Sequence, residues 1–195
     1  DKAKHYMKYV TDGAAQARNL ISDVLNYARV DNDTGQLVNI ESEKMLSGVL
    51  RDLGTLIEET GAQITHDALP EVCIQPTHLR QILQNLINNA LKFCGEKPQI
   101  HISATQEGAM WCFSVRDNGI GIAAEHMQKI FFIFQRLHSR ERYQGTGIGL
   151  ALCKKLVQKY GGSIWVESEI NKGSYFYFTL PPAVNKENEA AYRTG

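Results

Sequence analysis

The chain has 195 residues, and its 21 basic and 21 acidic side chains give a formal net charge of zero. This length suits one well-buried domain with an appended element, and the balanced charge favours neither a nucleic-acid partner nor an anionic membrane. The four cysteines form no Cys-x-x-Cys pair or Cys/His cluster. No run approaches the roughly eighteen apolar residues that cross a bilayer, and the charged start is not a signal peptide. We therefore expect no zinc site and a soluble, cytoplasmic piece, whose parent protein could still be membrane-anchored.

Residues 1–30 contain no proline and one glycine, which favours a long helix. Their apolar side chains recur with alternating spacings of three and four, at Met7, Val10, Ala14, Ala17, Ile21, Val24 and Ala28. This spacing is typical of the seam of a coiled coil or helical bundle, although a lone surface helix packed on its own domain remains the alternative. The polar residues 31–36 predict a linker.

Residues 37–181 predict one domain, followed by a polar, disordered tail at residues 182–195. We expect helices at residues 42–60, 77–93, 123–134 and 148–160, and strands at residues 37–40, 62–65, 71–75, 100–106, 110–116, 163–168 and 174–180. Helices combined with antiparallel hairpins favour an α+β fold, a two-layer sandwich in which helices cover one face of a mixed sheet.

The helix at residues 77–93 carries amide side chains beside an apolar face. Asn85 and Asn89 lie four residues apart and Lys92 three further on, so the three share one stripe. A solvated surface with incidental amides is the ordinary explanation. The functional alternative is that amide oxygens coordinate a hard cation while the Lys92 ammonium contacts phosphate, a combination suited to magnesium-nucleotide.

Two glycine-rich runs follow. Residues 117–122, Asp-Asn-Gly-Ile-Gly-Ile, come directly after a predicted strand. They form either a plain turn or a place where the backbone approaches a flat ligand. In the second case, Asp117 would accept a hydrogen bond from an amine of that ligand. Residues 145–150, Gly-Thr-Gly-Ile-Gly-Leu, lead into a helix, which favours close approach to a phosphate chain. The second run is neither a Rossmann nor a Walker motif.

Residues 137–144 lie between these two runs and show no apolar pattern. Arg136, Arg140 and Arg142 lie in or beside this segment. A polar, cationic segment at this place predicts a mobile lid.

Taken in order, these motifs resemble the boxes of sensor histidine kinases: the N box at residues 79–93, the first glycine box at 117–122, the F box at 130–137 and the second glycine box at 145–150. Residues 161–168 and 173–181 are similar to the last two strands of the same domain, so the resemblance covers roughly residues 37–181. It implies the Bergerat ATP-binding sandwich shared by gyrase, Hsp90-type chaperones, histidine kinases and mismatch-repair ATPases. Residues 134–138 and 145–155 look like those of kinases attached to phytochrome-like or PAS sensors.

The resemblance also implies residue roles, with ATP and Mg²⁺ as the cofactors. Asn89 matches the magnesium-binding asparagine, Asn85 and Lys92 match flanking phosphate and metal contacts, and Arg136 matches a lid arginine that reaches the terminal phosphate. Asn85, Lys92 and Arg136 are thus the expected catalytic residues. The remaining ATP-binding residues are an aromatic beside adenine, the adenine-binding aspartate and the two glycine boxes: Phe93, Asp117, Gly119, Gly121, Ile122, Gly145, Thr146, Gly147, Ile148, Gly149 and Leu150. Tyr175 departs from the threonine that many relatives have at its position.

Residues 1–30 resemble the second helix of the dimerisation hairpin of this family, through which a parent protein would form homodimers. The phosphate-accepting histidine of the family lies in the upstream helix, before an acidic residue and a proline. None of the six histidines has that setting: His5, His66, His78, His101, His126 and His138. We therefore expect an excised fragment that lacks the phosphoacceptor.

The implied function is binding of Mg-ATP and transfer of its γ-phosphoryl group to a histidine of the dimerisation domain, which then passes it to a response-regulator receiver domain. One alternative is a gyrase-like or chaperone-like ATPase, which uses a glutamate at the position of Asn85. An amide cannot deprotonate water, so rapid hydrolysis is disfavoured. The other alternative is a degenerate kinase that acts only as a dimerising interaction module.

Overall fold

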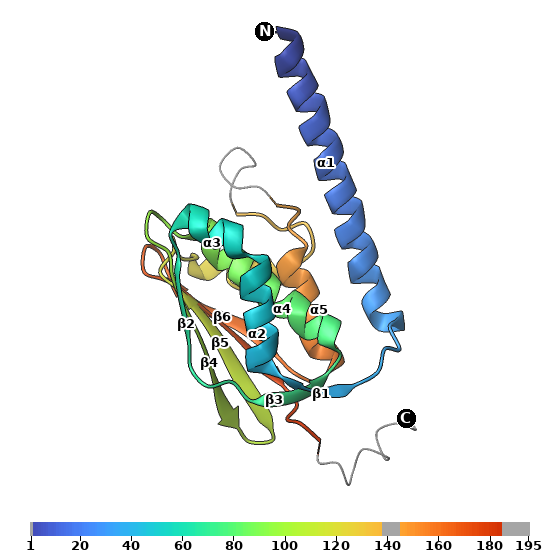
Figure 1. The fold of residues 1–195 in the computed structure, drawn as a ribbon, viewed down its shortest axis with the longest axis vertical. Coiled ribbons are helices and arrows are strands. Elements are labelled where there is room, and N and C mark those ends of the chain that lie inside the picture. Colours follow the sequence, from blue (N-terminus) through green and yellow to red (C-terminus); the bar gives the residue numbers. More distant parts are fainter. Residues whose placement is uncertain (1, 138–144, 185–195) are drawn as a thin grey trace.

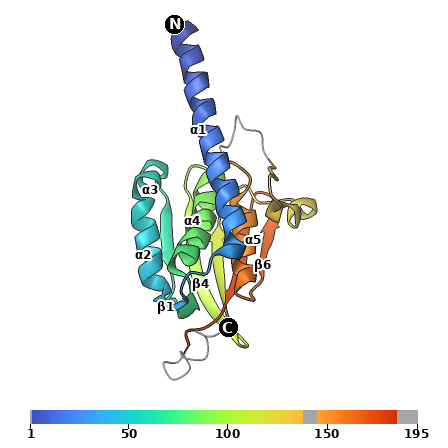
Figure 2. The same cartoon turned by 90° about the vertical axis from the view of Figure 1, so that its right-hand side faces the viewer.

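The computed structural model describes residues 2–137 and 145–184 (Figure 1). Helix α1, Lys2–Arg29, is followed by a 3-10 turn, Val30–Asn32. The N-terminal part of α1 extends away from the domain, and its C-terminal part lies along helix α5, Gly149–Lys159 (Figure 2). All seven seam residues are exposed, Met7 to 66%. The alternative in which this apolar stripe packs on its own domain is therefore wrong.

A five-stranded mixed sheet forms one layer of the domain, with the strand order β2-β4-β5-β7-β6. Only β2 and β4 are parallel, and the other neighbours are antiparallel. The strands are β2 (Gln63–His66), β4 (Gln99–Glu107), β5 (Met110–Asp117), β6 (Ile164–Glu169) and β7 (Gly173–Leu180). A separate antiparallel pair joins β1 (Val38–Glu41) to β3 (Glu71–Ile74).

Helices α2 (Ser42–Asp52), α3 (Gly54–Thr60), α4 (Pro76–Phe93) and α5 form the second layer, on one face of the five-stranded sheet (Figure 1). This arrangement confirms the predicted α+β, two-layer fold. Within the described residues, no helix combines the length and apolar character needed to cross a membrane.

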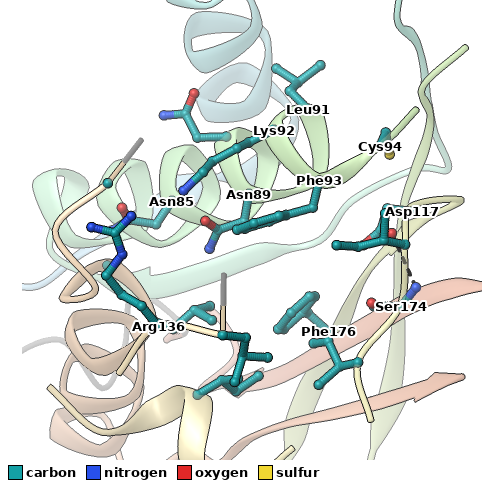
Figure 3. Close-up of a pocket in the computed structure, with 18 of the residues that line it drawn as sticks. Asn85, Asn89, Leu91, Lys92, Phe93, Cys94, Asp117, Arg136, Ser174 and Phe176 are labelled. Atoms are coloured by element: carbon teal, nitrogen blue, oxygen red, sulfur yellow. Dashed lines mark hydrogen bonds between the residues drawn. The ribbon is translucent and has the colours of Figure 1, made fainter. Parts of the chain in front are cut away.

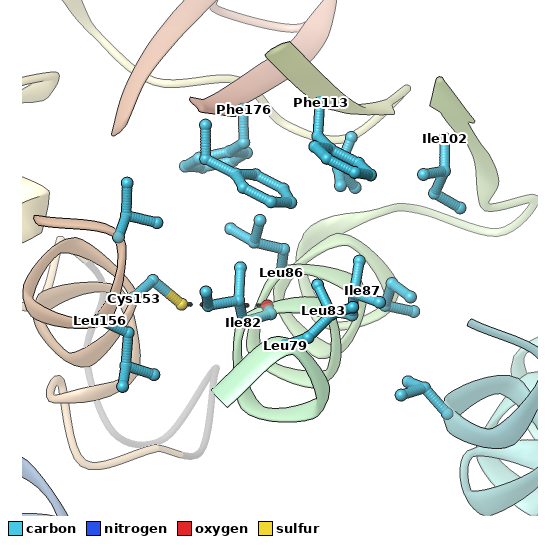
Figure 4. Close-up of a cluster of buried hydrophobic side chains, with 14 of the residues drawn as sticks. Leu79, Ile82, Leu83, Leu86, Ile87, Ile102, Phe113, Cys153, Leu156 and Phe176 are labelled. Carbon is cyan, nitrogen blue, oxygen red and sulfur yellow. Dashed lines mark hydrogen bonds between the residues drawn. The ribbon is translucent and has the colours of Figure 1, made fainter. Parts of the chain in front are cut away.

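The core lies between α4 and the sheet (Figure 4). Ile82, Leu83 and Leu86 of α4 are fully buried, because apolar residues three and four apart share the helix face that meets the sheet. Phe113 of β5 and Phe178 of β7 are paired across the strands, and their rings stack with centroids 5.0 Å apart. The stripe of Asn85, Asn89 and Lys92 therefore lies on a different side of α4 from the face that packs on the sheet.

Two predicted helices differ from the structure. The predicted helix at residues 42–60 is broken at Leu53, whose side chain is buried and whose ψ of 3° leaves the helical region just before Gly54. The predicted helix at residues 123–134 is instead two 3-10 turns, Ala124–His126 and Lys129–Phe131. Phe134 has a φ of 63°, which ends any right-handed helix.

The chain leaves the domain later than predicted. Pro182 pairs with Val72 of β3, and the side chain of Asn39 exchanges two hydrogen bonds with the backbone of Val184, at 2.8 and 2.9 Å. The expected disorder from residue 182 is therefore wrong for residues 182–184, because strand-edge pairing satisfies their backbone groups. Residues 185–195 lie outside the described part of the chain.

Candidate functional site

A cavity of about 990 Å³ opens between α4 and the two glycine-rich runs (Figure 3). Most of the predicted site residues line it, namely Asn85, Asn89, Lys92, Phe93, Asp117, Gly121, Ile122, Arg136, Gly145, Thr146, Gly147, Gly149 and Leu150. The structure thus brings together three motifs that are far apart in the sequence. The volume of the cavity is within the range of small-molecule and cofactor pockets.

Asp117 lies at one end of the cavity, where strand β5 stops. It is buried, with 6% of its surface exposed. Its Oδ1 accepts hydrogen bonds from the backbone N–H groups of Gly119 (2.8 Å) and Ser174 (3.2 Å). Burial raises the pKa of Asp117, although these two hydrogen bonds oppose the shift. Both backbone bonds use Oδ1, so Oδ2 takes no part in them.

The walls beside Asp117 are apolar. Phe93, from the last turn of α4, and Phe176, from β7, both line the cavity (Figure 3). Phe176 points inward because alternate residues of β7 face the helices. A carboxylate between flat apolar surfaces suits an aromatic ring that carries an amine.

The other end of the cavity is cationic. Lys92 on α4 and Arg136 from the opposite wall both point into it (Figure 3). Burial, and then the charge of Arg136, lower the pKa of Lys92. The ammonium also lies 4.5 Å from the centroid of the Phe93 ring. Two like charges held in a partly buried space are relieved by a bound anion, so this end suits a phosphate chain.

The amides of α4 lie between these two ends. A Cβ added at Gly149, the first residue of α5, would lie 2.9 Å from Asn85 Oδ1. Asn89 is one turn further along α4 (Figure 3). Within the described parts of the chain, no cluster of three His, Cys, Asp or Glu side chains could hold a metal. Amide oxygens are hard, neutral ligands, so the residues present fit a magnesium ion that a phosphate chain also coordinates.

Two glycines allow the backbone to close around the cavity. A Cβ on Gly121 (φ 69°) would lie 2.0 Å from the carbonyl oxygen of Glu169. A Cβ on Gly147 (φ 75°) would lie 2.9 Å from the carbonyl oxygen of Gln135 and 3.0 Å from Arg136 Cγ. Any other residue would displace these walls, so both positions require glycine. The backbone at Gly147 therefore lies close to Arg136, the predicted lid arginine.

Two predicted residues do not line the cavity. Gly119 contributes its N–H to Asp117, and the next residue, Ile120, donates to the Phe93 carbonyl at 3.0 Å. Ile148 is 1% exposed, and its carbonyl accepts the first hydrogen bond of α5, from Leu152. Both residues therefore shape the site from behind its surface.

Tyr175 also lies away from the cavity, on the face of the sheet opposite to helices α2–α5. It stacks on Tyr177, with ring centroids 6.2 Å apart, and Arg116 lies 5.1 Å from its ring centroid. Its departure from the family pattern therefore does not alter the cavity wall.

Several lining residues were not predicted from the sequence. Ser174 and Phe176 follow from the alternation of β7, which places them on the same face as Asp117. Leu56, Glu59 and Thr60 come from α3, and Asp23 comes from α1, where its Oδ2 accepts a hydrogen bond from Thr146 Oγ1 at 2.6 Å. The contributions of α3 and α1 depend on tertiary packing and leave no local signal.

The predicted lid lies almost wholly outside the described residues. Of residues 137–144, the structure describes only Leu137, which lines the cavity. Arg140 and Arg142 belong to the part that is not described, so the lid remains a prediction.

Comparisons with known proteins agree with this geometry. Residues 74–184 match the family described as histidine kinase-, DNA gyrase B-, and HSP90-like ATPase. Cyanobacterial phytochrome A of Nostoc sp. is 49% identical over 92% of this chain, and phytochrome-like protein Cph1 of Synechocystis sp. is 42% identical over 93% of it. The chain spans 24% of the length of each.

A solved structure resembles this chain over nearly its whole length. Full-length ShkA in complex with AMPPNP superposes with a TM-score of 0.77 at 28% identity, over 95% of this chain and 40% of that one. The family match covers more than half of the chain, and it includes every cavity-lining motif. The chain therefore belongs to the family of histidine kinase-, DNA gyrase B- and HSP90-like ATPases.

Proposed function

We propose that this chain binds Mg-ATP and is the phosphoryl donor half of a protein-histidine kinase. The observation that supports this most is the polarity of the cavity, with Asp117 at one end and the Lys92 and Arg136 cations at the other. That polarity matches a nucleotide, which has an amine-bearing ring at one end and anionic phosphates at the other. The AMPPNP complex of ShkA supports the same proposal, because AMPPNP is an ATP analogue.

Each residue then has a role that suits its side chain. Asp117 accepts a hydrogen bond from the exocyclic amine of adenine, and Phe93 packs beside the ring. Lys92 and Arg136 neutralise charge on the phosphates and align the terminal group. A bound magnesium, held by Asn89, supplies further charge neutralisation. Phosphoryl transfer needs such neutralisation and alignment more than covalent help from the protein.

The phosphoryl acceptor is proposed to lie in the parent protein. We infer that residues 1–30 are the second helix of a dimerisation hairpin, residues 31–36 a linker and residues 37–181 the ATP-binding domain. The exposed seam of α1 supports this division, because an apolar stripe turned away from the domain suits a helical partner. The acceptor is a histidine of the upstream helix, and a response-regulator receiver domain takes the group from it. A cytoplasmic location remains a prediction from the composition.

Labelling with radioactive ATP tests this proposal. With γ-labelled ATP and magnesium, the chain alone should stay unlabelled, whereas addition of the parent's complete hairpin should give acid-labile phosphate on the hairpin. A hairpin whose histidine is replaced by glutamine is the matched control and should stay unlabelled.

Two outcomes contradict the proposal. Acid-labile phosphate on the chain alone would show that it carries its own acceptor. Tight ATP binding without any transfer to the hairpin would favour the interaction-module alternative instead.

A further inference from the structure

Helix α1 contacts the domain through the stripe opposite its seam. Lys155 Nζ of α5 donates to the carbonyl of Tyr27 at 3.0 Å and lies 4.4 Å from the centroid of its ring. Lys159 Nζ donates to the carbonyl of Val30 at 2.7 Å, and Val30 is 4% exposed. Lysines that meet the last carbonyls of a helix complement its dipole, so the C-terminal end of α1 is held on α5.

Asp23 lies one turn before Tyr27 on this stripe and enters the cavity wall. It is half-buried, and its Oδ2 accepts a 2.6 Å hydrogen bond from Thr146 in the second glycine run. Lys92 and Arg136 line the same cavity. A carboxylate of the first helix therefore forms part of the wall of the nucleotide cavity, at the run expected to meet phosphate.

A phosphate group at this run and the carboxylate of Asp23 would compete for the hydroxyl proton of Thr146, and their charges would repel each other. The hydroxyl of Thr146 has one proton to donate, and it already donates to Asp23. Two anions near each other in a partly desolvated space also repel more strongly than in water. The competition is greatest for the terminal phosphoryl group, which ATP has and ADP lacks.

We propose that Asp23 is a specificity-determining charge gate, which disfavours a terminal phosphoryl group while α1 is docked on α5. This inference rests on the proposed function and adds a regulation of the same site. Docking of α1 lowers the preference of the cavity for ATP over ADP. Reciprocally, ATP loosens α1 from the glycine run, because coupling between two binding events is symmetric. The helix that carries the exposed seam is thereby linked to the identity of the bound nucleotide.

Calorimetry with Asp23→Asn tests the gate. Asparagine keeps the size of the side chain and an acceptor for Thr146, but it removes the charge. We measure the dissociation constants of Mg-AMPPNP and Mg-ADP for the unchanged chain and for the variant. The ratio of the ADP constant to the AMPPNP constant should rise at least about fivefold in the variant, the lower end of ordinary allosteric coupling.

Asp52→Asn is the matched control. Asp52 pairs with Arg80 on the surface, and neither residue belongs to the contact between α1 and α5 or to the cavity wall. Its loss should leave the ratio unchanged. Hydrogen exchange adds a second measurement. AMPPNP should speed exchange in residues 22–36 of the unchanged chain more than ADP does, and the difference should shrink in Asp23→Asn.

The possible results separate the two proposals. Binding of both nucleotides with an unchanged ratio in Asp23→Asn overturns the gate and leaves the proposed function intact. An equal change in Asp52→Asn also overturns it, because the effect would then follow from the loss of any carboxylate and not from the charge of Asp23. If the unchanged chain binds neither nucleotide, the proposed function fails and the gate fails with it.

Discussion

Replacement of Asp117 by asparagine tests the adenine end of the cavity. Asparagine keeps an oxygen that can accept from the N–H groups of Gly119 and Ser174, so the strand end stays in place. The other atom becomes an NH₂ group, which faces the exocyclic amine of adenine as a second donor. The variant therefore removes one hydrogen bond to a charged acceptor and leaves the backbone contacts unchanged.

The size of the effect follows from that single bond. A hydrogen bond to a charged group contributes about 1.5–3 kcal/mol, which corresponds to roughly a ten- to a hundredfold loss of affinity. ATP and ADP should lose affinity equally, because both carry the same ring. Inosine nucleotides, which have a carbonyl in place of the amine, should lose less or gain, since the new NH₂ group can donate to that carbonyl.

Stability should change in the opposite direction to affinity. Burial raises the pKa of Asp117, so its ionised form is less favourable in the folded chain than in the unfolded chain. Stability is therefore lost as the pH rises from the ordinary carboxyl pKa through the folded one. Asparagine carries no charge, so at pH 7 the variant should unfold at a higher temperature.

Calorimetry with ATP, ADP and ITP, together with thermal unfolding, measures both effects. Asp52→Asn is the control, since it removes a carboxylate that pairs with Arg80 on the surface. A folded Asp117→Asn chain with unchanged affinity for ATP would refute the assignment of this residue to adenine.

Three further predictions concern the rest of the site and its support. Asn89→Ala should remove most of the magnesium dependence of ATP binding, and an equal response of variant and parent to a chelator would contradict this. Lys92→Met should weaken the binding of ATP by roughly tenfold or more, because it removes a charged contact to the phosphates. Burial and the neighbouring arginine lower the pKa of Lys92, so the same variant should raise the melting temperature of the chain without nucleotide. Lys44→Met is the control and should change neither quantity. Burial also lowers the pKa of His78, so stability is lost as the pH falls from about 6.5 through the lower pKa of the folded chain. In His78→Gln the melting temperature should fall less over that range, and identical pH profiles would rule this out.

The motifs on α4 and in the two glycine-rich runs were predictable because their chemistry is local. A stripe of Asn85, Asn89 and Lys92 needs only helical spacing, and a glycine such as Gly147 marks a close approach wherever it lies. The strands were predictable for the same reason, since alternation decides which residues of β7 face the helices.

What the sequence did not predict depends on contacts between distant segments. Asp23 reaches the cavity only because Lys155 and Lys159 hold the end of α1 on α5. The helix break at Leu53 reflects burial of that side chain, and the left-handed Phe134 disrupts a run whose composition favours a helix. Tertiary packing overrides local preference at each of these places.

The central claim is that the cavity beneath α4 is the ATP site of this chain. A chain of 21.9 kDa is small enough for two-dimensional NMR with ¹⁵N labelling, so a titration with Mg-AMPPNP tests the claim residue by residue. Saturable shift changes should concentrate in residues 85–94, 117–122 and 145–150, and Mg-ADP should change the residues around Asp117 in the same way. Absence of saturable shifts at millimolar nucleotide, or shifts concentrated away from these segments, would contradict it.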